Sequence, residues 1–304
     1  MNNRCWLPLV LGLALLAAPL VAASPAVEEP PPTVRPDRIL GIFGGMGPEA
    51  TANLYAEIVR LTPAARDQDH IPTLIYSLPQ VPDRTAAIQA NDPAIIPWLV
   101  EGVTRLEKAG AAFIVIPCNT AHYFHDQMQA AVSIPILHMI REAADEVVRR
   151  HPECQTVGLL ATTGTLQTGL YAKEFAARGI GVVTPDEAVE RDCVMQAVYG
   201  HIKAGTGRQE AEDLLARAGD HVETKGAQVI VLGCTEIPLA FNPARAHVPV
   251  VNATRVLAEA AIRAYRQPRR QPLPEPAVAP EAPAPARSAE SVPVGTVSNN
   301  AIMR

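Results

Sequence analysis

Apolar runs alternate with amphipathic stretches through the middle of the chain. The predicted buried strands are short and rich in β-branched residues, and they cover 38–45, 71–79, 111–118, 134–139, 156–164, 181–185, 228–234 and 248–254. Between them, apolar residues recur at helical spacing over 49–62, 95–110, 139–151, 168–179 and 210–226. This alternation predicts an α/β fold in which mostly parallel sheets are flanked by helices.

The two ends of the chain have a different composition. Arg4 precedes an apolar run from Leu7 to Ala23 that ends in small residues, which predicts a signal peptide over 1–23 and a periplasmic or secreted protein. A membrane anchor is the alternative, but the run is shorter than the roughly 20 apolar residues that a span needs. The Pro-rich segment 24–36 is typical of a linker, and the Pro/Ala-rich segment 268–304 predicts a disordered tail.

Composition adds little beyond this. The 304 residues are 48% hydrophobic, which is enough for a substantial core, and the net charge is -5. Such mild acidity gives no reason to expect nucleic acid as a partner, or a membrane once the signal peptide is cleaved.

Two segments of the folded part are repeated. "GAAFIVIPCNT" from Gly110 matches "GAQVIVLGCTE" from Gly226, and "LGIFGGMG" from Leu40 matches "VGLLATTG" from Val157 at nearly the same separation. The repeat predicts two pseudo-symmetric lobes with an active-site cleft between them. We expect lobe 1 to span 37–150 and to be completed by the returning segment 250–267, and lobe 2 to span 151–249.

The repeat places one cysteine at the end of a strand in each lobe. Ligands of open α/β sheets bind outside the carboxyl ends of the strands, so Cys118 and Cys234 are expected to face one cleft from opposite sides. Two opposed thiols suit the movement of a proton from one face of a carbon to the other, with a thiolate as base and a thiol as acid. Amides and side chains of the residues that follow the cysteines can hold a carboxylate and its enolate-like form; these residues are Asn119, Thr120, Thr235 and Glu236.

Several motifs together resemble aspartate racemases of the cofactor-independent aspartate/glutamate racemase family. They are "GIFGGMGPEAT", "PQVPDRTAAI", "PCNTAHYFHD", "LLATTGT" and "GCTEIP", and the resemblance runs from about residue 39 to 257. It implies a racemase that needs no pyridoxal phosphate, forms a homodimer and binds an amino acid between two lobes. Two departures stand out: the family is mainly cytosolic, and Asn252 stands where relatives often have Asp.

The resemblance also implies roles for individual residues. Cys118 and Cys234 match the two acid/base residues, and Arg84 and Lys203 match the cations that hold substrate carboxylates. A substrate-contacting stretch follows the first cysteine and comprises Asn119, Thr120 and Ala121. Glu236 favours an aspartate racemase, since glutamate racemases typically carry His after the second Cys-Thr. The implied reaction is the interconversion of L- and D-aspartate or a related amino acid.

Other functions and other roles for the cysteines stay open at this level. The superfamily also includes hydantoin racemases and maleate isomerases, and two α/β lobes around a cleft also suit an exported amino-acid-binding protein without catalysis. In an oxidising compartment Cys118 and Cys234 can form a disulfide, and so can Cys154 and Cys193.

No metal site is predicted. His122 and His125 lie near Cys118, but the tight clusters of ligands typical of metal sites are absent from the sequence, and a helix-capping or surface role is expected for His122. The segment Gly45-x-Gly47-x-x-Ala50 loosely matches a dinucleotide fingerprint. We expect it instead to be a loop whose amides line the substrate cleft, with Met46 facing in.

Overall fold

The computed structural model describes residues 38–267. The predicted signal peptide 1–23, the linker 24–36 and the tail 268–304 lie outside the described residues. Within 38–267, no helix is both long enough and apolar enough to cross a membrane.

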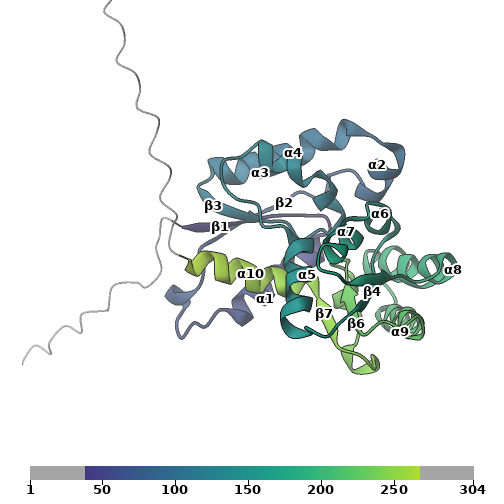
Figure 1. Cartoon of the computed structure of the whole chain (residues 1–304). Coiled ribbons are helices and arrows are strands. Elements are labelled where there is room, and N and C mark those ends of the chain that lie inside the picture. Colours follow the sequence, from purple (N-terminus) through teal and green to yellow (C-terminus); the bar gives the residue numbers. More distant parts are fainter. Residues whose placement is uncertain (1–37, 268–304) are drawn as a thin grey trace, which may run out of the picture. The chain divides into compact units, whose positions relative to one another are not determined.

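Two parallel sheets form the framework (Figure 1). The first has the order β2-β1-β3, the second has the order β5-β4-β6-β7, and every pairing within them is parallel. The strands are β1 (Ile39–Gly44), β2 (Thr73–Ser77), β3 (Ala111–Val115), β4 (Thr156–Leu160), β5 (Gly181–Val183), β6 (Val229–Leu232) and β7 (Val250–Asn252). The expected α/β class, with parallel sheets flanked by helices, is confirmed.

Helices connect the parallel strands, as such connections require. The longer ones are α1 (Pro48–Leu61), α2 (Arg84–Ala90), α3 (Ile96–Lys108), α4 (His125–Ala130), α5 (Met139–Arg150), α6 (Thr163–Gln167), α7 (Leu170–Ala176), the π-helix η4 (Glu190–Ile202), α9 (Arg208–Thr224) and α10 (Ala253–Arg266). Single turns are α8 (Glu187–Val189), η1 (Asp67–Asp69), η2 (Pro93–Ile95), η3 (Thr120–Phe124), η5 (Ile237–Leu239) and η6 (Pro243–Arg245).

The two sheets repeat the same arrangement of strands. β1 lies between β2 and β3, and β4 lies between β5 and β6, so each is flanked by the two strands that follow it in the chain. β3 and β6 therefore occupy equivalent places in the two sheets. The matched sequence segments are these four strands and the loops that follow them. The repeat read from the sequence therefore corresponds to a repeat in the fold.

The returning segment 250–267 divides between the two halves. Its strand β7 pairs with β6 and extends the second sheet, which differs from the expectation that the segment completes lobe 1. Its helix α10 packs against α1 and α5 (Figure 1). The expected strand at 134–139 is also missing, since Pro135 has no N–H to donate, and only a single bridge joins Ile114 to Ile136.

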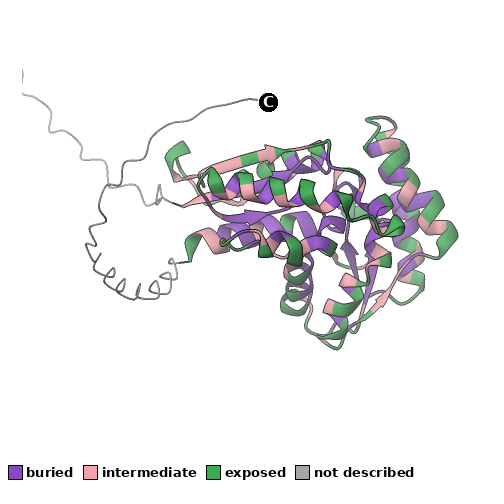
Figure 2. Cartoon of the chain, turned by 90° about the horizontal axis from the view of Figure 1, so that it is seen from above, coloured by how far each residue is buried: buried purple, intermediate pink, exposed green. Residues whose placement is uncertain are grey.

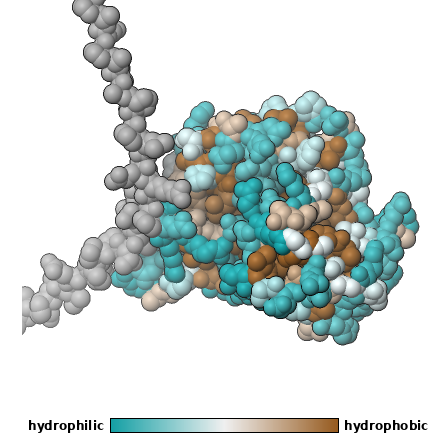
Figure 3. Space-filling model, in the orientation of Figure 1, coloured by the Kyte–Doolittle hydropathy of each residue, from teal (hydrophilic) through white to brown (hydrophobic). Residues whose placement is uncertain are grey.

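One hydrophobic core connects the halves. It includes Leu40 and Phe113 from the first sheet, Val157 and Val229 from the second, and the buried faces of α5 and α10. Figure 2 shows this buried interior as purple strands and inner helix faces, with exposed residues on the outer helix faces. Figure 3 shows a largely hydrophilic surface on the described part of the chain, with apolar groups gathered near the centre of the visible face.

Candidate active site

Cys118 and Cys234 line one small cavity. Cys118 follows β3 and Cys234 follows β6, so both thiols stand at the carboxyl ends of equivalent strands. They are 5% and 7% exposed, and the cavity measures about 20 Å³. The other residues that line it are Met46, Asp83, Arg84, Thr85, Asn119, Thr120, Thr162, Tyr199, Lys203, Thr235 and Glu236.

Nearly all the residues proposed from the sequence lie in this lining. Ala121 is the exception: it is fully buried and packs in the apolar cluster behind Cys118. The sequence did not single out Asp83, Thr85, Tyr199 or Thr162, although Asp83 and Thr85 flank Arg84 in the "PQVPDRTAAI" motif. Thr162 lies in the "LLATTGT" motif, which was the one signal that could have found it.

Two pairs of loops join the halves at the cavity. The loop after β3 meets the loop after β4, where the hydroxyl of Thr120 lies 2.7 Å from that of Thr165 and 3.4 Å from that of Thr162. The loop after β6 meets the loop after β1, where the amide of Gly47 donates to Glu236 Oε1 over 3.1 Å. These contacts are related by the repeat, but one involves only hydroxyls and the other a carboxylate.

The glycine-rich loop after β1 fits tightly against the chain. Gly45 has φ +94°, and a Cβ at this position would lie 2.3 Å from the backbone nitrogen of Leu78. The Gly45 amide donates to Thr51 Oγ1, and the Gly47 amide is held by Glu236. Met46 is 2% exposed and lines the cavity. Because these amides already have partners within the chain, the loop is not arranged as a free phosphate cradle.

Arg84 begins α2 and is largely buried, with 9% exposure. Its guanidinium donates only to backbone carbonyls, those of Met46, Val81 and Pro82, and its buried Nε has no partner. Burial opposes its charge, but interactions with Cys118 and Asp83 outweigh burial and raise the pKa of Arg84. Arg84 is therefore a cation beside Cys118 with donor capacity left for a substrate.

On the Cys234 side of the cavity, the Glu236 carboxyl group is the central hydrogen-bond acceptor. Its Oε1 accepts from Gly47 and lies 2.9 Å from Lys203 Nζ, and its Oε2 accepts from the hydroxyl of Thr235 and from the thiol of Cys234 at 3.1 Å. The Glu236 carboxyl group thus accepts from four donors and donates to none. Burial, followed by the charge interaction with Glu236, raises the pKa of Cys234 well above its ordinary value.

Asn119 is positioned by a tyrosine from the second half of the chain. The hydroxyl of Tyr171 on α7 donates to Asn119 Oδ1 over 2.6 Å, and both side chains are buried. The amide nitrogen of Asn119 is buried and has no partner within the chain. Since Asn119 lines the cavity, this nitrogen is available to a substrate oxygen.

His122 supports the Cys118 loop from behind. Nδ1 lies 2.8 Å from the carbonyl oxygen of Cys118, and Nε2 accepts from the amide of Met139 at the first turn of α5. Burial, with His138 as the next cause, lowers the pKa of His122 to about 3, so the ring is neutral near pH 7. Its role is helix capping, one of the two roles expected for it.

The remaining cysteines lie outside the cavity. Cys154 and Cys193 are buried, and all four cysteines within 38–267 are free thiols. Among the described residues, the one group with a spacing suited to a metal ion is Asp220, Glu223 and His247. It does not include any residue that lines the cysteine cavity.

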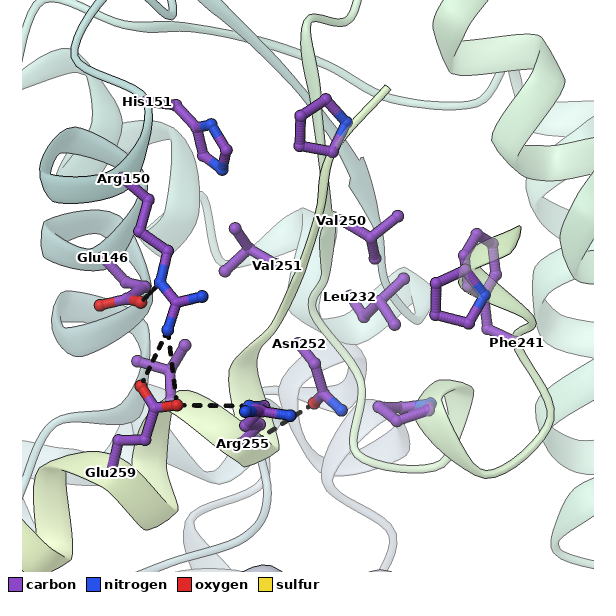
Figure 4. Close-up of a pocket in the computed structure, with 14 residues that line it drawn as sticks. Glu146, Arg150, His151, Leu232, Phe241, Val250, Val251, Asn252, Arg255 and Glu259 are labelled. Carbon is purple, nitrogen blue, oxygen red and sulfur yellow. Dashed lines mark hydrogen bonds and ion pairs between the residues drawn. The ribbon is translucent and has the colours of Figure 1, made fainter. Parts of the chain in front are cut away.

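A larger cavity of about 530 Å³ is lined by residues of α5, β7 and α10 and by Leu232 at the end of β6 (Figure 4). The ends of α5 and α10 meet β7 there, and apolar walls come from Leu232, Phe241 and Val251. Its two arginines are held by carboxylates, since Arg150 pairs with Glu146 and Glu259, and Arg255 pairs with Glu259. None of its lining residues is a cysteine.

Two buried thiols at the ends of repeated strands are the arrangement expected of an acid/base enzyme that exchanges protons at one carbon. The family model for Asp/Glu/hydantoin racemases matches residues 43–261. The chain therefore belongs to this racemase family and is an isomerase.

Similar proteins agree with this assignment. The broad specificity amino-acid racemase RacX of Bacillus subtilis is 29% identical over 236 residues, which cover 75% of this chain and 98% of that protein. The structure of Picrophilus torridus aspartate racemase aligns with a TM-score of 0.67 at 28% identity, covering 75% of this chain and 94% of the other. A putative Asp/Glu racemase from Yersinia pestis aligns with a TM-score of 0.64 at 29% identity, covering 76% and 100%.

Proposed function

We propose that this protein is an amino-acid racemase that interconverts L- and D-aspartate without pyridoxal phosphate, with Cys118 and Cys234 as its two acid/base residues. The observation that carries the proposal is the placement of two buried thiols, from equivalent strand ends, in the lining of one cavity. One thiolate removes the α-proton, and the opposing thiol delivers a proton to the other face of the carbon. The roles exchange for the opposite enantiomer.

The donors around the cavity suit a substrate carboxylate. The unpartnered nitrogens of Arg84 and Asn119 can hold its oxygens and stabilise the enolate-like form. Lys203 supplies a second cation, which suits the side-chain carboxylate of aspartate. The likeness to an aspartate racemase structure supports the same substrate.

A broader range of amino acids is the second candidate. Lys203 is already paired with Glu236, so a substrate carboxylate has to compete with Glu236 for it. An amino acid with an uncharged side chain needs only one cation for its α-carboxylate, and Arg84 can provide it. The broad specificity of the Bacillus subtilis relative supports this candidate.

Proton exchange tests the proposal. The purified protein is incubated with L-aspartate in heavy water, with and without reductant and without added pyridoxal phosphate. Loss of the α-proton is followed by NMR and the enantiomer ratio by chiral chromatography. We expect both exchange and the appearance of D-aspartate. Repeating the assay with neutral amino acids separates the two substrate ranges.

Absence of exchange with a full panel of amino acids, in both redox states, would contradict the proposal and favour a binding protein. Activity on hydantoins or maleate alone would point to another reaction of the superfamily. Activity that requires reductant would show that the two thiols can be oxidised. A homodimer and an extracytoplasmic location remain predictions, to be checked by light scattering and by cell fractionation.

A further inference from the structure

The small cavity lined by the two thiols, the thiol cavity, leaves no room for the side chain of a substrate. It measures about 20 Å³, which holds about one water molecule. A second cavity of about 490 Å³, which we call the outer cavity, adjoins it and shares Asp83, Arg84, Tyr199, Lys203 and Glu236 with it. The 530 Å³ cavity shares none of the residues that line the thiol cavity. The outer cavity is therefore the place into which a side chain can extend from the reacting carbon.

The outer cavity has apolar walls from both halves of the chain. Pro79 and Val81 precede α2, and Pro48 begins α1. Ile202 ends η4, and Leu239 ends η5. Small-molecule sites are typically cavities of about 300–1,000 Å³ with mostly apolar linings, and the outer cavity lies within this range of volume. Its walls suit an apolar group several carbons long.

The charged side chains at the outer cavity already have partners within the chain. Glu49 pairs with Arg208 over 2.9 Å, and Lys203 pairs with Glu236 over 2.9 Å. The carboxylate of Asp83 accepts from a tyrosine hydroxyl and from a backbone amide. A side chain with a charged end would have to displace one of these contacts, or lose its hydration without gaining a partner. The outer cavity therefore favours an uncharged side chain.

The donors for the α-carboxylate lie at the inner end. The buried Nε of Arg84 and the amide nitrogen of Asn119 have no partner within the described part of the chain. Asn119 lines the thiol cavity and not the outer cavity, whereas Arg84 lines both. A substrate whose carboxylate binds these two donors keeps its α-carbon beside the thiols. Its side chain then extends toward Ile202 and Leu239, which line the outer cavity and not the thiol cavity.

We propose that the outer cavity is a side-chain subsite for long, uncharged, apolar side chains, so that amino acids such as norleucine are substrates in addition to aspartate. The inference rests on the proposed racemase function for its reaction, which is the same proton exchange at the α-carbon. It rests on the outer cavity for the binding of the side chain. Leu239 is then a specificity-determining residue, because it forms part of the apolar wall.

A homologous series of amino acids tests the subsite. The full-length protein is assayed with L-alanine, L-2-aminobutyrate, L-norvaline and L-norleucine, and chiral chromatography gives kcat/KM for each. Every methylene that enters an apolar cavity should raise kcat/KM about three- to fourfold. We therefore expect norleucine to exceed alanine at least tenfold. Values of kcat/KM that are flat or fall along the series would overturn the inference.

The end of the side chain tests the chemical class. L-2-Aminoadipate carries a carboxylate where norleucine has its terminal methyl group, and L-lysine carries an ammonium group at the end of a similar chain. We expect kcat/KM for each of them to be at least tenfold below that for norleucine. A value above that for norleucine, for either one, would mean that the charged groups and not the apolar walls hold the side chain, and would overturn the assigned class.

Two variants change the wall in different ways. Leu239→Trp fills part of the outer cavity, and Leu239→Asn makes its wall polar. Each should lower the ratio of kcat/KM for norleucine to that for alanine at least fivefold, and a ratio is insensitive to loss of folded protein. Leu214→Trp is the matched control, because Leu214 is also half-buried against the same apolar cluster but lines neither cavity, and its ratio should stay native. A native ratio in both Leu239 variants would overturn the inference.

Binding measured without turnover separates this inference from the proposed function. Calorimetric titration of the same amino acids into the protein should show affinity that rises from alanine to norleucine. This rise without any racemisation would disprove the proposed function alone. Racemisation of aspartate with no gain in affinity or in kcat/KM along the series would disprove the inference alone.

Discussion

The proposed mechanism requires both thiols for racemisation, but each thiol alone should still exchange a proton on one face of the substrate carbon. Cys118→Ala or Cys234→Ala should lower racemisation at least ~10³-fold, since one of the two proton transfers loses its group. Chiral chromatography measures this loss, and NMR in heavy water measures exchange with each enantiomer. Cys193→Ala is the control, because Cys193 lies outside the cavity. Single variants with full activity would rule out the two-thiol mechanism.

Tyr171 fixes the orientation of Asn119 without lining the cavity itself. Tyr171→Phe removes one buried hydrogen bond, so the free energy of unfolding should fall by about 1 kcal/mol in a urea titration. The racemisation rate should fall roughly 10- to 100-fold, since a misplaced substrate donor is costly. Tyr123→Phe is the control, because Tyr123 is exposed. Native kinetics in Tyr171→Phe would show that Asn119 does not depend on this bond.

Among single residues, those that could be predicted from the sequence lie within motifs at the ends of strands. Cys118, Cys234, Asn119, Thr120, Thr235 and Glu236 follow strand ends that the apolar pattern marks clearly. Tyr171 and Tyr199 reach the site from helices of the second half, through packing that no local pattern records. The partners of Lys203 and Arg84 could not be predicted from the sequence either. Lys203 pairs with Glu236 and Arg84 donates to backbone carbonyls, and both contacts depend on how the loops fold.

Among the elements, the π-helix η4 was missed for a geometric reason. Its buried residues Cys193, Val194, Ala197, Val198 and Ile202 recur at steps of four to five. A search for the 3.6-residue period of an α-helix does not detect such a spacing. The strands were easier to predict because buried parallel strands are short apolar runs. This missed helix carries Tyr199 and ends at Lys203, so the omission concealed part of the site.

The loop after β1 is limited by how closely it approaches Leu78. Gly45→Ala should destabilise the protein through its positive φ, at about 1–2 kcal/mol, and further through the clash with the Leu78 backbone. Gly110→Ala is a matched control, since Gly110 has φ +97° and open space around its Cβ position. Urea titration of both variants isolates the clash. Equal losses of stability would mean that the loop can move away from Leu78.

The start of α5 makes the protein sensitive to acid. Burial lowers the pKa of His122 to about 3 and that of His138 to about 4, whereas both bind protons near pH 6.5 when unfolded. The unfolded state therefore binds more protons between these values, and stability is lost as the pH falls from about 6.5 toward 3. The loss approaches about 1.4 kcal/mol per pH unit for each histidine.

Urea titrations at pH 7, 6, 5 and 4 measure this slope. His122→Gln should flatten it, because the amide does not titrate. His247→Gln should leave it unchanged, because His247 is exposed and lies far from α5 in the sequence. A native slope that persists in His122→Gln would assign the acid sensitivity to other groups.

In the molecule as a whole, the described conformation is closed around the thiols. A cavity of about 20 Å³ holds about one water molecule, so an amino acid fits only after groups that line the cavity move. A neighbouring cavity of about 490 Å³ shares Asp83, Arg84, Tyr199, Lys203 and Glu236 with it and marks the route of entry. The bond from the Tyr199 hydroxyl to Asp83, 3.0 Å long, spans the two halves at this point.

Tyr199→Phe should favour the open form, because it removes this bond and keeps the ring. Both cavity thiols should then react with iodoacetamide several-fold faster, while the unfolding free energy changes by about 1 kcal/mol or less. Tyr55→Phe is the control, since Tyr55 is exposed on α1. Unchanged labelling would show that another contact limits access.

The unequal neighbours of the two thiols are subject to a thermodynamic limit. In water the enantiomers of an amino acid have equal free energy, so the equilibrium constant between them is one. The ratio kcat/KM must therefore be the same in both directions, whatever charge stands beside each sulfur. The carboxylate of Glu236 can separate the two kcat values only if it separates the two KM values by the same factor. A Haldane ratio of one, in the native protein and in every variant, is thus the internal standard for all the kinetics proposed above.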